Sequence, residues 1–275
     1  MGTEATGAET TGDVMVGTSG YSYADWVGPY YPPGTERKDF LPIYASEFNF
    51  VELNFSYYTQ PQPRIFERML SGTPETFHFC VKGHRSMTHE VGEHITSSTR
   101  AFRVGIEPLV RSSRLVSVLL QFPYSFHYTP ESRKHLDRLS RLLEGLPLAF
   151  EFRNNEWQKD SVYATMRERG IALVSVDEPR LPRLPRPDET VTADRGYLRL
   201  HGRNKANWWK GTNTSRYDYL YSEQELADWV TRVNRIVRKV KLLLIAFNNH
   251  YKSQAVRNAR TMRRMLVESG LERVE

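Results

Sequence analysis

Short apolar runs alternate with longer amphipathic stretches along this chain, and this alternation is the main guide to its fold. Each run is rich in Val, Ile, Leu, Phe or Tyr and is bounded by turn or charged residues, which is typical of a buried β-strand. The pattern predicts eight strands, at Val14–Gly17, Phe50–Phe55, Phe77–Lys82, Leu115–Phe122, Leu148–Arg153, Ile171–Asp177, Gly196–Gly202 and Lys241–Asn249.

Several of the intervening stretches have helical periodicity. Leucines recur on one face of Glu131–Leu143, as expected for an amphipathic helix that packs on a sheet. Ser222 followed by Glu225 forms a capping-box pattern, which predicts that a helix begins there. The other predicted helices cover Ser161–Arg169, Ser222–Lys239 and Val256–Glu268.

Eight strands alternating with helices predict an α/β protein, a single (β/α)8-type TIM barrel over residues 14–275 with some helices irregular or missing. Glu178–Arg195 contains four prolines, and Arg203–Tyr221 is long, basic and aromatic, so both are predicted to be loops. An open doubly wound sheet is the alternative. It would favour a GxGxxG loop after the first strand, where this chain reads GTSGYSY.

Composition refines this picture without changing the fold class. Residues 1–13 (MGTEATGAETTGD) are predicted to form a disordered tail, and they lack the basic and apolar regions of a signal peptide. The single cysteine, Cys80, cannot form an internal disulfide. The longest apolar run, Leu242 to Phe247, is far shorter than the roughly 20 residues that span a bilayer. We therefore expect a cytoplasmic protein without a membrane partner.

The net charge of +6 permits an anionic small molecule or nucleic acid as a partner, but does not require one. Two basic stretches, Arg235–Lys241 and Arg257–Arg264, are compatible with nucleic-acid binding across helix surfaces. Solvated helix faces are often basic for no other reason. The sequence leaves the oligomeric state open.

Polar side chains gather where several predicted strands end. In FVELNF, Glu52 and Asn54 share one face, because alternate strand residues point to opposite sides. TIM-barrel sites lie at the C-terminal ends of the strands, so this polar face predicts a ligand site in the barrel mouth. Its members are Glu52, Asn54, Lys82, Gln121, Glu151, Arg153, Asp177, Arg199, His201, Arg203 and either Asn248 or Asn249.

Seven segments resemble, in order, the YecE-like family, catalogued as domain of unknown function 72. They are GTSGYSYADWVGPYYP (17–32), VELNFSYYTQP (51–61), FHFCVKGHRSMTH (77–89), LLQFP (119–123), AFEFRNNEW (149–157), YLRLHGR (197–203) and FNNHYKSQAVRNA (247–259). The resemblance runs from Val16 to about Leu266. It implies one barrel in the group that includes endonuclease IV and xylose isomerase, and a family without an established activity.

The resemblance also implies a set of pocket positions. Family members often have an aspartate after the asparagines of the last strand, where this chain has His250, so no role is carried over there. The implied positions are Glu52, Asn54, Tyr58, Lys82, His89, Gln121, Glu151, Arg153, Trp157, His201, Arg203 and Asn248.

The first functional hypothesis is a hydrolase-like enzyme acting on a phosphate-bearing substrate, nucleic acid included. Lys82, Arg153 and Arg203 would hold the anion. The candidate catalytic residues are Glu151, His201, Asp177 and His89, with the histidines as general acid or base. Aromatic residues at the mouth would stack on bases or sugars, although Trp26 and Trp157 favour packing instead. These aromatics are Tyr21, Tyr23, Trp26, Trp208 and Trp209.

The sequence requires no cofactor, and it leaves open whether the protein binds a divalent metal. Its candidate ligands are Glu52, Glu151, Asp177 and His201, although no HxxxH or HExxH spacing occurs. A sugar-processing hydrolase is a second hypothesis, with Glu151 and Asp177 as its paired carboxylates. A barrel that binds nucleic acid or another anion without catalysis is the third.

Overall fold

The structure is a computed structural model that describes residues 11–275. Eight parallel strands pair in chain order, and β1 also pairs with β8, so the sheet closes into a barrel. The prediction of a single (β/α)8 TIM barrel is confirmed, and the open-sheet alternative is wrong. The strands are β1 Asp13–Ser19, β2 Phe50–Leu53, β3 His78–Lys82, β4 Leu115–Gln121, β5 Leu148–Glu151, β6 Ala172–Asp177, β7 Arg195–Leu200 and β8 Leu242–Phe247.

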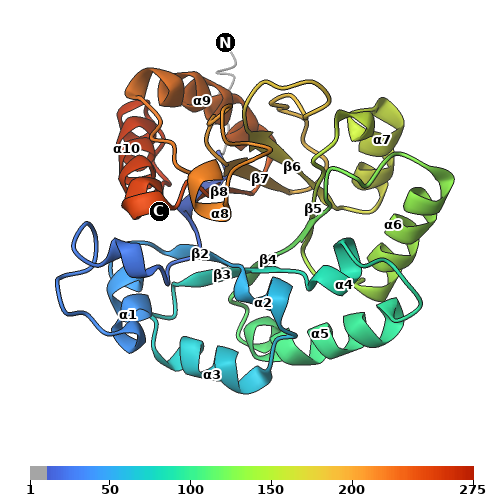
Figure 1. Cartoon of the computed structure of the whole chain (residues 1–275), viewed down its shortest axis with the longest axis horizontal. Helices are drawn as coiled ribbons and strands as arrows, with labels where there is room; N and C mark the ends of the chain where they lie inside the picture. The colour runs from blue at the N-terminus through green and yellow to red at the C-terminus, as the bar shows by residue number, and fades with distance from the viewer. Residues whose placement is uncertain (1–10) are drawn as a thin grey trace, which may run out of the picture.

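Helices surround the barrel on its outer side (Figure 1). The predicted capping box is present at the start of α9, where Ser222 and Glu225 exchange hydrogen bonds. The helices are α1 Phe40–Ala45, α2 Phe55–Tyr58, α3 Pro63–Ser71, α4 Arg85–Thr88, α5 Ile95–Arg111, α6 Pro130–Leu142, α7 Asp160–Glu168, α8 Asn213–Arg216, α9 Glu223–Ile236 and α10 Gln254–Glu268. Short 3-10 turns lie at Ala24–Trp26 (η1), Arg37–Asp39 (η2), Asn155–Trp157 (η3), Val237–Lys239 (η4) and Tyr251–Ser253 (η5).

Two connections depart from the regular alternation, as the sequence predicts. The chain between β6 and β7 runs through residues 178–194 without a helix, because its prolines remove backbone donors and block the helical turn. The observed loop is one residue shorter than the predicted one, because Arg195 is already the first residue of β7. The long segment after β7 contains only the four-residue helix α8 before α9 begins.

The N-terminal prediction lies almost entirely outside the described residues. Of the predicted tail, only residues 11–13 are described, and Asp13 is the first residue of β1. The proposed disorder of residues 1–10 therefore stays a prediction. Within residues 11–275, no helix combines the length and the apolar character needed to cross a membrane.

Two layers of side chains fill the barrel interior. The lower layer is apolar and includes Phe50, Cys80, Val174 and Leu244, all buried. Above it, at the C-terminal ends of the strands, the inward positions turn polar. The buried members of this upper layer are Ser19, Glu52, Glu151, Glu178, Arg199, His201 and Asn248. The fold thus places a charged layer directly above an apolar one.

Candidate functional site

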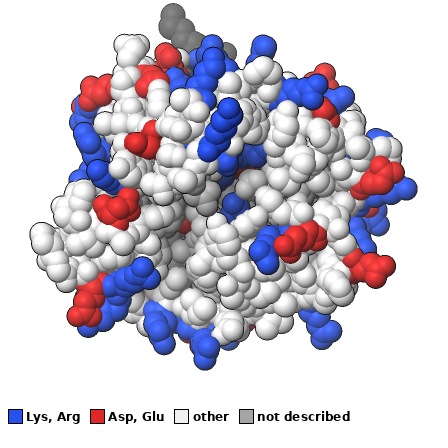
Figure 2. All heavy atoms as spheres, viewed as in Figure 1, with Lys and Arg blue, Asp and Glu red and all other residues white. Residues whose placement is uncertain are grey.

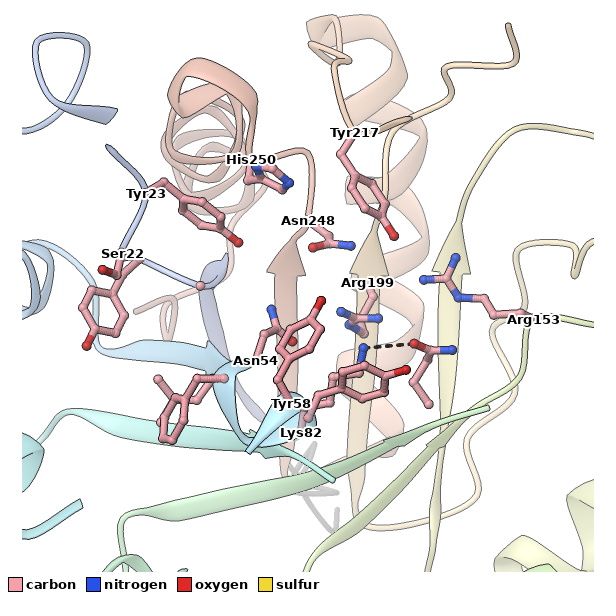
Figure 3. Close-up of a pocket in the computed structure, with 16 residues that line it drawn as sticks. Ser22, Tyr23, Asn54, Tyr58, Lys82, Arg153, Arg199, Tyr217, Asn248 and His250 are labelled. Carbon is pink, nitrogen blue, oxygen red and sulfur yellow. Dashed lines mark hydrogen bonds between the residues drawn. The ribbon is translucent and has the colours of Figure 1, made fainter. Parts of the chain in front are cut away.

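A cavity of about 560 Å³ opens above the charged layer, at the C-terminal ends of the strands (Figure 3). Its charged wall residues are Lys82, Arg153 and Arg199. Among the described residues that line it there is no aspartate or glutamate. The neutral polar wall residues include Asn54, Gln121 and Asn248, and the aromatic ones are Tyr21, Tyr23, Phe55, Tyr57, Tyr58, Tyr217 and His250.

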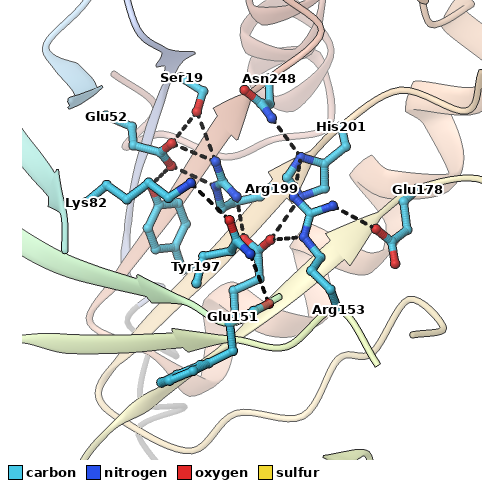
Figure 4. A network of polar contacts seen from close by, with 12 residues as sticks. Ser19, Glu52, Lys82, Glu151, Arg153, Glu178, Tyr197, Arg199, His201 and Asn248 are labelled. Atoms are coloured by element: carbon cyan, nitrogen blue, oxygen red, sulfur yellow. Dashed lines mark hydrogen bonds and ion pairs between the residues drawn. The ribbon is translucent and has the colours of Figure 1, made fainter. Parts of the chain in front are cut away.

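Arg199 is the centre of the cavity floor (Figure 4). Its Nε and Nη2 atoms donate to the two carboxylate oxygens of Glu52, each at 2.7 Å, and its Nη1 donates to Glu151. Glu52 also accepts from the hydroxyls of Ser19 and Tyr197. Burial alone raises the pKa of Glu52, but the charge and hydrogen bonds of Arg199 outweigh it and hold the pKa below its usual value. Glu52 therefore anchors the floor as an ionised carboxylate.

Glu151 is fully buried between two arginines. One oxygen accepts from Arg199 and the other from Arg153. Burial raises the pKa of Glu151, yet the two guanidinium charges dominate and hold it well below the usual value. A general acid must carry a proton near neutral pH. Glu151 is therefore unsuited to act as a catalytic acid, because it is ionised and each of its oxygens accepts a hydrogen bond from an arginine.

His201 lies beneath the cavity, with no exposed surface. Two donors, Nδ2 of Asn248 at 3.0 Å and Nη2 of Arg153 at 3.4 Å, face its Nδ1 atom. Nδ1 is therefore the acceptor, and the ring proton resides on Nε2, 3.4 Å from Glu151. Burial and the Arg153 charge lower the pKa of His201 to about 3. This histidine is neutral and orients Asn248 and Arg153, which do line the cavity.

Lys82, the last residue of β3, differs from the arginines below it. Its Nζ donates to Oε1 of Gln121 at 3.0 Å and lies 4.7 Å from the centroid of the Tyr57 ring. No carboxylate of residues 11–275 forms an ion pair with it. Burial, together with the Arg199 charge, lowers the pKa of Lys82 to about 8. Two of its three N–H groups remain available to a ligand.

Arg153 connects the cavity floor to Glu178, a carboxyl group that is not among the predicted site residues. Its Nη1 donates to Glu178 at 3.1 Å. Glu178 is 4% exposed, and burial raises its pKa to about 8; the Glu151 charge adds to this rise and Arg153 opposes it. With Glu178 protonated, three cations (Lys82, Arg153 and Arg199) oppose two carboxylates, which leaves one positive charge at the cavity.

Asp177 and Arg203 were expected at the mouth, and that expectation is wrong. Asp177 is buried on the outer side of β6, where Arg203 donates to both its oxygens at 2.8 and 2.6 Å. The hydroxyl of Tyr221 and the indole N–H of Trp229, on α9, also donate to it. Arg203 in turn pairs with Glu225 at 3.0 Å. This cluster joins the barrel to α9.

We predict that Asp177→Asn destabilises the protein without changing the cavity. The amide cannot accept from all the donors around Asp177, and hydrogen bonds to a charged group contribute roughly 1.5–3 kcal/mol. The free energy of unfolding in urea should fall by about 2–3 kcal/mol. Ligand affinity should stay unchanged, because Asp177 lies outside the cavity. If Asp177→Asn lost ligand binding while keeping the stability of the wild type, Asp177 would be part of the binding site and the prediction would be contradicted.

Two tryptophans also lie away from the cavity. Trp157 is 2% exposed, stacks on Phe126 and Phe152, and donates its indole N–H to Phe126. Its inferred role in substrate binding is therefore wrong, and packing explains it. Trp26 is buried too, with its indole N–H on the carbonyl of His250.

Other rim residues keep a relation to the site. The buried ring of Trp208 lies 5.8 Å from the guanidinium carbon of Arg153, and Trp209 is 51% exposed beside Tyr124. His89 contacts Tyr57 edge to face. Burial, with the Lys82 and Arg153 charges, lowers the pKa of His89 to about 4, so this histidine is neutral at the rim.

The four proposed metal ligands do not form a metal site. No group of three or more His, Cys, Asp or Glu side chains in the described part of the chain is arranged to hold an ion. Glu52 and Glu151 are neutralised by Arg199, and Asp177 faces α9. Glu151 and Asp177 point to opposite sides of the barrel wall. They therefore cannot act as the paired carboxylates that the sugar-hydrolase hypothesis requires.

The alternation in β7 correctly placed Arg199 on the polar face with His201, although the sequence assigned it no role in catalysis or binding. Other site residues were not selected from the sequence. Glu178 follows directly after the strand residue that was chosen in its place. Tyr217 and His250 come from loops, where periodicity gives no guide. The His250 ring stacks on Tyr23 at a centroid distance of 4.5 Å.

Residues 15–274 match the family described as "Protein of unknown function DUF72". The chain belongs to the DUF72 family. It is 33% identical over 269 residues to the UPF0759 protein YunF of Bacillus subtilis (strain 168), which covers 92% of this chain and 94% of YunF. The UPF0759 protein YecE of Escherichia coli (strain K12) is 29% identical over 147 residues, which is 50% of this chain and 52% of YecE.

Solved structures of the DUF72 family have the same fold. A family member from Thermotoga maritima MSB8 superposes with a TM-score of 0.86 at 41% identity, covering 93% of this chain and 99% of that one. A member from Enterococcus faecalis V583 gives 0.82 at 29% identity, covering 92% and 95%. A xylose isomerase-like TIM barrel fusion protein gives 0.51 at 11% identity, covering 94% of this chain and 44% of that one, and it supports the barrel fold alone.

Proposed function

We propose that this protein is an enzyme whose substrate is a phosphate-bearing small molecule held in the barrel mouth. The charge of the cavity wall carries the proposal, because Lys82, Arg153 and Arg199 line it and no acidic residue of the described chain does. Figure 2 shows basic atoms inside the central hollow of this face. Cavities of roughly 300–1,000 Å³ are typical of small-molecule sites, and this one is about 560 Å³.

The donors on this wall suit a phosphate group. Three of the five N–H groups of Arg153 face Glu151, Glu178 and His201 among the described residues, which leaves two for a ligand. Lys82 contributes two more. A planar guanidinium pairs bidentately with phosphate oxygens, and an ammonium adds a point charge. The tyrosines of the wall offer faces for a ring on the same ligand.

The surface of the helices is a weaker candidate for an anion site. In the two basic stretches, Arg235 pairs with Glu189, Arg260 with Glu47 and Arg264 with Glu223 and Glu268. Much of their charge is therefore balanced locally. This favours the cavity over the hypothesis of nucleic-acid binding across the helices.

A nucleic-acid strand entering the mouth is the second candidate. The rings of Tyr58 and Trp209 are 62% and 51% exposed at this end of the barrel. Exposed aromatic rings stack on bases in many single-strand binding proteins. A terminal phosphate in the cavity, with the next bases on these rings, would fit both features.

We predict that adenosine 5′-monophosphate binds more tightly than adenosine, and that Lys82→Met weakens this binding by roughly ten-fold or more. The variant removes a cation that has no carboxylate partner among residues 11–275. Isothermal titration calorimetry at two salt concentrations measures the effect, and affinity should fall as salt rises.

Lys159→Met is the matched control. Lys159 also lies against a tyrosine ring, 4.6 Å from the centroid of Tyr128, but it is exposed and outside the cavity. Its replacement should leave the affinity unchanged. Equal affinities for the nucleotide and the nucleoside would contradict the proposal. Tighter binding of a 5′-phosphorylated oligonucleotide than of the mononucleotide would favour the second candidate.

A further inference from the structure

The environment of Lys82 is unusual for a lysine that only contributes charge. Lys82 is partly buried, and an ammonium group withdrawn from water normally pairs with a carboxylate, because its desolvation is costly. Lys82 instead has a neutral amide oxygen and an aromatic ring as its neighbours. The carboxylates next to it, Glu52 and Glu151, are already bound by arginine.

Lys82 is a cation near neutral pH, but burial and two nearby arginines lower its pKa and so raise the fraction of neutral amine. Arg199 on β7 and Arg153 after β5 disfavour the protonated amine, whereas Glu52 on β2 and Glu151 on β5 favour it. The neighbouring groups on the other elements, Tyr57, Gln121 and His89, carry no charge near neutral pH. Burial and these arginines lower the pKa of Lys82 to about 8. A neutral amine is a nucleophile, and lysines beside a second cation are activated in this way.

We propose that Lys82 forms an imine with an aldehyde or ketone that carries an anionic group, phosphate or carboxylate, which Arg153 holds. This inference rests on the proposed function and names its substrate class. The lone pair of Nζ attacks the carbonyl carbon, and the carbonyl π electrons move to the oxygen. The C–O bond then breaks, and the oxygen leaves as water with the two protons of the amine. The step needs no oxidant or reductant.

The anion site and the nucleophile lie on one wall. Figure 3 shows Lys82 and Arg153 pointing into the same cavity, with Arg199 in the floor between them. A ligand whose anion binds Arg153 would extend along this wall toward Nζ, whose hydrogen-bond and ring neighbours, Gln121 and Tyr57, are neutral. The cavity is open to solvent, so water formed in the reaction can leave.

The test uses pyridoxal 5′-phosphate as a phosphorylated aldehyde, pyridoxal as its counterpart without phosphate, and glyoxylate as a carboxylate-bearing aldehyde. The wild-type protein is incubated with each, reduced with sodium borohydride and digested, and the labelled lysines are located by peptide mass spectrometry. We expect roughly ten-fold more adduct on Lys82 than on Lys159, because a larger fraction of Lys82 is neutral. Labelling should rise with pH up to about 8, the pKa of this amine.

Two comparisons make the result specific. Pyridoxal 5′-phosphate should label Lys82 faster than pyridoxal does, and inorganic phosphate should slow that labelling. A faster reaction of glyoxylate would assign carboxylate as the anionic group. The Lys159→Met variant should be labelled at Lys82 as the wild type is.

The outcomes separate this inference from the function beneath it. Absence of an adduct on Lys82, or labelling no faster than at Lys159, overturns the imine even where adenosine 5′-monophosphate binds in calorimetry. That combination leaves the phosphate site intact. Failure of both labelling and nucleotide binding overturns the imine together with the proposed function.

Discussion

An Arg199→Met variant is expected to be about 3–5 kcal/mol less stable than the wild type. Arg199 is 1% exposed, and four of its five N–H groups donate to Glu52, Glu151 and Ser19. Methionine fills a similar length but leaves two buried carboxylates without their common partner. Breaking a buried ion pair from one side is costly because the remaining charge stays desolvated. The predicted loss is a large fraction of the roughly 5–15 kcal/mol that stabilises a typical protein.

Urea unfolding of four proteins tests this prediction: the wild type, Arg199→Met, Glu52→Gln and the double variant. The double variant should be more stable than Arg199→Met alone, because the amide removes one of the unpaired charges. Arg260→Met is the matched control. Arg260 pairs bidentately with Glu47 at 2.5 and 2.8 Å but is half exposed, so its loss should cost about 1 kcal/mol or less. Strictly additive effects at Glu52 and Arg199 would show that the pair is not the source of stability.

The sequence predicts this barrel well because its strands alternate so clearly. On β2, β5 and β7 the apolar face packs under the helices and the polar face turns inward, so Glu52, Glu151 and His201 could be placed in the barrel interior from alternation alone. What alternation could not show is how these side chains pair. The ion pairs join residues up to 147 positions apart in the sequence, and a single arginine, Arg199, pairs with carboxylates on two different strands.

The same rule fails on β6 for a physical reason. Its inward residues are Ala172, Val174 and Val176, so the polar face, which ends in Asp177, points outward. The partners that make this burial possible, Arg203, Tyr221 and Trp229, follow 26 to 52 residues later in the chain. A polar residue at a strand end therefore points into the barrel mouth only where the outer side of the barrel offers it no polar side chain as a partner.

Helix α5 is an element that the hydrophobic pattern of the sequence failed to predict. At 17 residues it is the longest helix in the described part of the chain, yet no helix is predicted there from the sequence. Gly105 and Pro108 interrupt the helical pattern. The glycine is required by packing, since a Cβ at Gly105 would lie 2.3 Å from the carbonyl oxygen of Pro61. Tertiary contact thus selects a residue that local propensity disfavours.

A Glu178→Gln variant is expected to gain stability relative to the wild type as pH rises from about 5 to about 9. Burial raises the pKa of Glu178 from its usual 4.5 to about 8, with Arg153 opposing the shift and Glu151 adding to it. Between these two values the folded wild type keeps a proton that the unfolded chain has released. Its stability therefore falls with rising pH, and the contribution of this group is lost above pH 8. Glutamine stays neutral, so the variant escapes this loss.

The difference between variant and wild type should grow by up to about 1.4 kcal/mol per pH unit, which reaches several kcal/mol over the full window. Urea unfolding of both proteins at pH 5, 7 and 9 measures it, and titrations elsewhere in the molecule cancel in the difference. Glu144→Gln, at an exposed glutamate, is the control and should give no such trend. A Glu178→Gln variant less stable than the wild type at pH 9 would mean that Glu178 is ionised and stabilised by Arg153. The cavity would then carry no excess positive charge, and the case for an anionic ligand would rest on Lys82 alone.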